Sequence, residues 1–358
     1  MNRLTAIGFA SLVAYGVLLA TKWDGSPAAA SKGSGTVVAT DAGAETSAPR
    51  SSVRASPALR PAGYARPAPV ASPVVMRLSP VAQQFRQSRD LKAFADTLLA
   101  RKDSLDNEER YYLAKALETC GFATSMNDDL AAASDKRRRQ FIATIPLSDP
   151  EAAKRIAAYD ASDDTQRCLG FQGVRITQKQ IDDLYRQASE GGDPRAQARM
   201  LVAELNRNLT TSKVGESARA VTTSDFQRII DLLETRDADA MVTVAQFLAQ
   251  HRLIGELRIG PAGEVPEPAS LVGAFTLVAC DYQPTCPAFD REALQACAYA
   301  GYCSAGTYEE LYANFLASPW SYGQAMRYRG VIHAAIDTQN WSLLGLQKLI
   351  GATSKAGL

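Results

Sequence analysis

The chain has 358 residues, of which 46% are hydrophobic, and a formal net charge of +1 at pH 7. This length exceeds that of one typical domain and is sufficient to bury a sizeable core. Counting Lys and Arg against Asp and Glu, residues 1–24 carry +1 and residues 25–79 carry +4, which leaves about −4 for residues 80–358. A mildly acidic body argues against a nucleic-acid partner, because nucleic-acid phosphates require clustered Lys and Arg.

Residues 4–21 form an uncharged, largely apolar segment near the N-terminus. Its length lies between that of a secretory hydrophobic region, about 7 to 15 residues, and the roughly 20 residues that span a bilayer. Trp23 at its far edge suits a membrane–water interface. Residues 1–24 are therefore predicted to anchor the chain in the inner membrane, with the body in the periplasm. The alternative is a signal peptide cleaved near Ala28–Ala30, which would release a periplasmic or secreted protein.

Residues 25–77 are rich in Ala, Pro, Ser and Gly and contain seven prolines. With almost no large apolar side chains, such a stretch cannot bury enough surface to offset its chain entropy. It is predicted to be a disordered tether with an r.m.s. span of roughly 40 Å.

From about residue 78 onward, apolar residues recur at intervals of three and four, which is the helical period. Leu91, Phe94 and Leu98 share one face of the first predicted helix. Four capping-box patterns mark further helix starts: Ser148-x-x-Glu151, Thr177-x-x-Gln180, Ser224-x-x-Gln227 and Thr307-x-x-Glu310. Residues 170–176 and 253–265 lack this pattern and are interpreted as loops or short hairpins. Residues 78–358 are therefore predicted to form an all-α body.

An acidic or Gly-Asp turn followed by an Ala-rich helix occurs three times, around Asp106, Asp193 and Asp237, with spacings of about 44 residues or twice that. Small Ala side chains let helices approach closely, as stacked helical pairs require. Together with residues 188–196, ASEGGDPRA, this pattern resembles the tetratricopeptide and Sel-one-like families of helical repeats. The resemblance implies an irregular α-solenoid of helical hairpins whose concave surface binds a protein or peptide. The alternative is an irregular helical domain without repeats.

All six cysteines lie in the body, and in an oxidising compartment an even count indicates disulfides. The last four, in the Cys-rich part at residues 271–350, form two copies of C-x5-C. In each copy the first Cys ends a predicted helix and the second follows a Pro or Gly turn, which favours local bridges. The alternative is a four-Cys zinc site, but zinc ligands normally pair at C-x2-4-C. The predicted disulfides are Cys280–Cys286, Cys297–Cys303 and, by elimination, Cys120–Cys168.

No catalytic, cofactor or metal site is predicted. The two histidines, His251 and His333, have no supporting pattern, and hydrolase, zincin and nucleotide motifs are missing from the sequence. One enzyme class remains open, because a helical lysozyme-like fold requires as little as one general-acid Glu in a cleft. The candidates for that acid are Glu118, Glu204 and Glu309.

Two clusters have competing interpretations. The basic run 136–139 lies among Asp residues, which favours a solvated, internally paired helix face over an anion site. Aromatic side chains near the C-terminus either form a partner or glycan surface or cap the last helices: Trp320, Tyr322, Tyr328 and Trp341.

The predicted organisation is an anchor or signal peptide (1–24), a tether (25–77) and a helical-repeat body (78–358). It resembles uncharacterised exported bacterial proteins with helical repeats and a Cys-rich C-terminal module. The predicted function is a protein-binding scaffold or adaptor of the bacterial envelope. The alternatives are a cell-wall glycan-active enzyme, which a deep acidic cleft would favour, and a purely structural spacer. A shallow groove lined by exposed Tyr and Asn would favour the scaffold.

Overall fold

The computed structural model describes residues 78–211, 221–250, 253, 257–283 and 286–346. The apolar segment 4–21, the tether 25–77 and His251 lie outside the described residues. Every regular element in the described ranges is a helix, apart from an isolated antiparallel bridge between Ile259 and Glu264, so the all-α prediction is confirmed. No helix in these ranges is both long enough and apolar enough to span a membrane.

The α-helices of the described residues are, in chain order, α2 (Pro80–Gln87), α3 (Leu91–Leu99), α4 (Asn107–Met126), α5 (Leu130–Thr144), α6 (Ala152–Ser162), α7 (Asp164–Arg167), α8 (Gln178–Glu190), α9 (Pro194–Thr211), α11 (Thr223–Glu234), α12 (Ala238–Leu248), α14 (Pro268–Tyr282), α15 (Pro287–Ala300), α16 (Tyr308–Leu311) and α17 (Pro319–Thr338). Shorter helical segments are η2 (Lys102–Ser104), η3 (Leu169–Phe171), the π-helical η4 (Tyr312–Leu316) and η5 (Trp341–Leu344).

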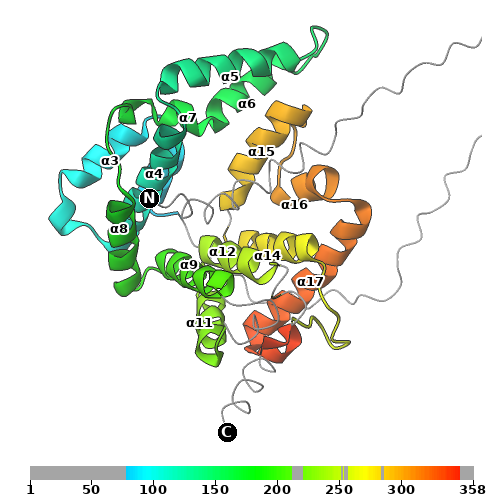
Figure 1. The fold of residues 1–358 in the computed structure, drawn as a ribbon. Coiled ribbons are helices and arrows are strands. Elements are labelled where there is room, and N and C mark those ends of the chain that lie inside the picture. The colour runs from blue at the N-terminus through cyan, green and yellow to red at the C-terminus, as the bar shows by residue number, and fades with distance from the viewer. Residues whose placement is uncertain (1–77, 212–220, 251–252, 254–256, 284–285, 347–358) are drawn as a thin grey trace, which may run out of the picture. The chain divides into compact units, whose positions relative to one another are not determined.

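The longer helices pack largely in the order of the chain (Figure 1). Helix α4 packs on α8, α8 on α9, α9 on α12, α12 on α14, and α14 on α17. One cluster of buried apolar side chains lies around α2, α3, α4 and α8, and another extends from α9 to η5. Helices α5 and α6 form a hairpin, and α6 packs against α15.

Helix starts follow local cap chemistry, with two corrections to the predicted positions. Thr177 forms the predicted capping box with Gln180. The box predicted at Ser224 is wrong, because Thr222 adopts the extended backbone of a cap and Asp225 completes the box.

The box predicted at Ser148 is also wrong, because α6 begins only at Ala152 and its N-cap makes no side-chain hydrogen bond. The short carboxylate of Asp149 accepts the Glu151 backbone N–H there instead.

At Thr307 the hydroxyl caps α16 by accepting the Glu310 backbone N–H. The Glu310 carboxylate reaches one residue further back than a capping box requires. Its Oε2 accepts the Gly306 N–H at 2.7 Å. The predicted start is therefore correct, and only half of the reciprocal bonding forms.

The three predicted Asp turns each cap a helix: Asp106 caps α4, Asp193 accepts the Ala196 N–H of α9, and Asp237 caps α12. The first two turns are in direct contact. Asn107 Nδ2 donates to Gly191 O at 2.6 Å, and a Cβ on Gly191 would lie 2.1 Å from Asn107 Oδ1. A side chain at position 191 would therefore require the Asn107 side chain to move.

Candidate functional site

The body contains three disulfides, and the four cysteines of the two C-x5-C copies are all consumed in them. No thiolate of these four remains for zinc, which removes that alternative. The Cα atoms of the two local pairs are 4.5 and 4.2 Å apart. The disulfides are Cys120–Cys168, Cys280–Cys286 and Cys297–Cys303.

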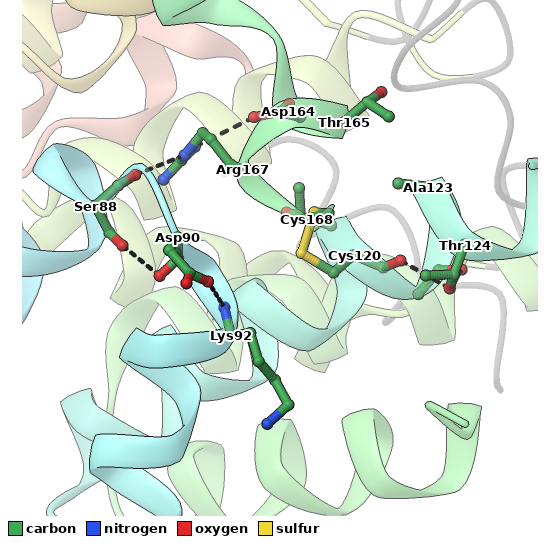
Figure 2. The surroundings of a disulfide bond; sticks show 12 residues. Ser88, Asp90, Lys92, Cys120, Ala123, Thr124, Asp164, Thr165, Arg167 and Cys168 are labelled. Carbon is green, nitrogen blue, oxygen red and sulfur yellow. Dashed lines mark hydrogen bonds and ion pairs between the residues drawn. A yellow bond between two sulfur atoms is a disulfide. The ribbon is translucent and has the colours of Figure 1, made fainter. Parts of the chain in front are cut away.

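The Cys120–Cys168 disulfide joins the middle of α4 to the end of α7 (Figure 2). Both cysteines are completely buried. Next to it, Arg167 donates from Nε to Ser88 O at 2.9 Å and from Nη2 to Phe85 O at 2.7 Å. This side chain therefore ties α7 to the C-terminal end of α2. The arrangement holds the first helices together.

The other two disulfides lie at the two ends of α15. Cys280 lies in the last turn of α14 and pairs with Cys286, the N-cap residue of α15. Cys297 lies in the last turn of α15 and pairs with Cys303, beyond the left-handed Gly301 that ends the helix. Both ends of α15 are thus fixed covalently, which also fixes the loop that follows it.

A cleft of about 700 Å³ lies among α14, α15, α16, η4 and α17. One of its walls contains the Cys280–Cys286 disulfide. A pocket of this size falls within the range of about 300 to 1,000 Å³ that is typical of ligand sites. Its charged lining consists of Asp281, Asp290, Glu309, Glu310 and Arg329, and its apolar and aromatic lining includes Leu277, Phe289, Tyr308 and Tyr322.

Arg329 holds together the two inner carboxylates of the cleft. Its Nε donates to Asp281 Oδ2 at 2.8 Å, its Nη2 bonds the other oxygen of Asp281, and its Nη1 donates to Glu309 Oε2 at 2.8 Å. Tyr322 donates its hydroxyl to Glu309 Oε1 at 3.1 Å. Helices α14, α16 and α17 are therefore cross-linked by charge-assisted hydrogen bonds, which preorganise this part of the cleft.

His333 lies beside this network and is fully engaged by the protein. Its Nε2 is 2.8 Å from Asp281 Oδ2, and its Nδ1 is 3.2 Å from the Tyr282 hydroxyl. Burial acts to raise the pKa of Asp281, but the hydrogen bonds from His333 and Arg329 outweigh it and lower that pKa. Because both ring nitrogens have partners, His333 serves as a structural link between α17 and α14.

Glu292 on α15 is a half-buried acid near the cleft. Burial raises its pKa to about 7, while a hydrogen bond with Tyr308 acts in the opposite direction. Its Oε2 atom is buried and has no hydrogen-bond partner among the described residues. Glu292 is not among the residues that line the cleft, although Tyr308 is. It therefore belongs to the packing behind the cleft wall.

Comparison of the chain with family models, with curated proteins and with solved structures finds no match.

The three glutamates proposed for a lysozyme-like enzyme do not come together. Glu118 bonds Arg199 and Tyr185 in the interface of α4, α8 and α9. Glu204 pairs with Arg228 on the surface, at 3.2 Å. Glu309 is the one of the three that lines the cleft. Its two oxygens are engaged by Arg329 and Tyr322, as described above.

Burial separates the C-terminal aromatic residues into two groups, and ion pairs decide how the basic run 136–139 is interpreted. Of the C-terminal aromatics, Tyr328 and Trp341 are buried in the core, whereas Trp320 is 61% exposed and Tyr322 lines the cleft. In the basic run, Arg138 pairs with Asp160 and Arg139 with Asp135. These ion pairs favour the internally paired helix face over an anion site.

Sequence reasoning missed most of the site, because Asp281, Asp290 and Arg329 fit no motif. Two local signals pointed toward this region. Asp281 follows Cys280 directly, at the start of a C-x5-C copy, and Glu309 and Glu310 follow a predicted cap. Neither signal indicates that Arg329 lies between two of these acids.

Proposed function

We propose that the chain is an exported, membrane-anchored scaffold or adaptor of the bacterial envelope whose body binds a partner polypeptide in the cleft among α14 to α17. The observation that carries this proposal is the cleft itself. It is large enough for a ligand, its inner carboxylates are held by Arg329, and one wall is fixed by a disulfide. Preorganised sites of this kind lose less entropy on binding.

Export is supported by the disulfides, which persist in oxidising compartments and are rare in the cytosol. It is also supported by the sequence of residues 4–21, which suits a signal anchor. In the same proposal, residues 25–77 are the tether that separates the body from the inner membrane.

Helical repeats are part of the proposed architecture. The supporting observations are the sequential packing of α4, α8, α9, α12 and α14 and the shared cap chemistry at Asp106, Asp193 and Asp237. In a repeat array each hairpin buries its apolar face against its neighbours, and loops on one face carry the binding function. The cleft would then be the binding surface formed by the last helices.

The cleft has features expected of a glycan-active enzyme and features expected of a protein-binding scaffold. It is acidic, as a glycan-active enzyme would require, and it also presents Tyr322 and the exposed Asn314. Two of its carboxylates are engaged by Arg329, and Glu292, a nearby acid whose pKa is raised, does not line the cleft. Binding is therefore better supported than acid catalysis.

Site-specific photo-crosslinking in membranes of the source cell tests the proposal. A photoreactive residue at Asn314, which lines the cleft, is compared with one at Lys179, whose side chain is 84% exposed on α8. We expect one polypeptide adduct at position 314 that is not formed at position 179. The substitution Ala313→Trp, which fills the cleft, should abolish the adduct at position 314. The control substitution Ala143→Trp, at an exposed position of α5, should leave that adduct unchanged.

Circular dichroism of each variant establishes that it is folded before crosslinking is compared. Adducts that form equally at positions 314 and 179, or that survive filling of the cleft, would contradict binding at this site. Crosslinking at position 314 to glycan instead of polypeptide would favour the glycan-active enzyme over the scaffold.

A further inference from the structure

Negative charge in the cleft exceeds positive charge, and the excess lies at its rim. Four carboxylates and one guanidinium line the cleft, and Arg329 is already shared by Asp281 and Glu309. The side chain of Asp290 is 68% exposed, and its Oδ2 lies 3.9 Å from Nη1 of Arg86 on α2. Glu310 is exposed and has its Oε2 bonded to the backbone of Gly306.

The cleft combines this acidic rim with an apolar lining from Leu277, Phe289 and the aromatic ring of Tyr308. A Lys or Arg side chain has the matching shape, with an apolar stem and a charged head. A concave, low-dielectric wall with charge of one sign also concentrates the field and raises the local concentration of cations.

Resting on the proposed function, we infer that the cleft binds a short cationic segment of the partner polypeptide. A Lys or Arg side chain of that segment lies over Phe289 and Leu277 and places its charge between Asp290 and Glu310. The cleft discriminates against acidic segments because their carboxylates would face its excess negative charge.

The test measures binding of a short labelled peptide of alternating lysine and glycine to the full-length, oxidised protein by fluorescence anisotropy. Two matched peptides carry acetyl-lysine or glutamate in place of lysine. The double variant Asp290→Asn with Glu310→Gln removes the rim charge, and the Gln amide oxygen can still accept the Gly306 N–H. The control is Asp135→Asn with Glu190→Gln, whose acids are 71% and 66% exposed on α5 and α8.

We expect the lysine peptide to bind and the other two to bind weakly or not at all. The rim variant should weaken lysine-peptide binding about five- to tenfold, in line with the loss of two exposed ion pairs, and the control should not. Raised ionic strength should weaken binding to the unmodified protein and have less effect on the rim variant.

Equal affinity for the lysine and acetyl-lysine peptides, or equal losses in the two double variants, would overturn the inference. If such charge-independent binding is abolished by Ala313→Trp, the cleft still binds polypeptide and the proposed function stands. If no peptide binds, or binding is indifferent to Ala313→Trp, the inference fails. The crosslinking experiment above then decides the proposed function independently.

Discussion

Arg195 and Glu108, which are 87 residues apart in sequence, form a hydrogen-bonded ion pair of 2.7 Å between the starts of α9 and α4. The same guanidinium bonds both oxygens of Asp193, whose side chain is 3% exposed, and lies 5.0 and 5.1 Å from the ring centroids of Tyr111 and Tyr112. One side chain thus connects two of the three Asp turns.

Arg195→Met should destabilise the body strongly, because it leaves Asp193 buried without its cation. We expect the free energy of unfolding to fall by about 3 to 5 kcal/mol, the usual cost of breaking a buried ion pair. Urea unfolding followed by circular dichroism measures this. The matched control is Arg186→Met, since Arg186 pairs with Asp183 and Glu190 on the surface and should cost less than about 1 kcal/mol. Comparable losses in both variants would contradict a central role for Arg195.

Gly191→Ala tests the contact between the first two turns. The new Cβ meets the side chain of Asn107, so Asn107 must move and give up its hydrogen bond to Gly191 O. We expect a loss of about 1 to 2 kcal/mol, since overpacking and a lost hydrogen bond each contribute on this scale. In an Asn107→Ala background the same substitution should cost clearly less. An undiminished cost in the double variant would show that the strain arises elsewhere.

The pKa of Glu292, about 7 against an ordinary value of 4.5, makes stability depend on pH. Between these values the folded state retains a proton that the unfolded state has lost, so the free energy of unfolding falls as pH rises from about 4.5 to 7. The total loss is roughly 3 kcal/mol. Glu292→Gln should remove this part of the pH dependence and stabilise the protein at neutral pH. Chemical unfolding at several pH values measures the effect, with Glu190→Gln as a control that should leave the profile unchanged.

Local sequence chemistry predicted much of the fold. Asp106, Asp193 and Asp237 signalled three helix starts, because a short carboxylate before a helix satisfies free backbone N–H groups wherever the helix later packs. The two C-x5-C pairs followed from spacing and helix ends, and Cys120–Cys168 followed by elimination. At Ser224 the prediction failed by two residues, since several Ser, Thr and Asp side chains compete there and only packing selects among them.

The site was less predictable, because its geometry is not local. Asp281, Glu309 and Arg329 come from three helices, and the separations of 20 and 48 residues between Arg329 and its partners carry no periodic signal. Glu309 was named in sequence as a candidate acid, but its partner could not be. His333 fitted no catalytic pattern in the sequence, and its bond to Asp281 depends on the contact between α14 and α17.

The disulfides should differ in their contributions because they close chain segments of different length. Cys120 and Cys168 are 48 residues apart, and Cys297 and Cys303 are 6 apart. In the chain-entropy description, removing the longer cross-link costs about 4 kcal/mol and removing the shorter one about 2 kcal/mol. Paired Cys→Ala variants, unfolded in denaturant without reductant, measure both values. We expect Cys120→Ala with Cys168→Ala to lower the unfolding midpoint more, because the link between α4 and α7 is lost from the buried core as well. A larger loss from the Cys297 and Cys303 pair would contradict this order and show that fixing the loop after α15 contributes more to the stability of the body.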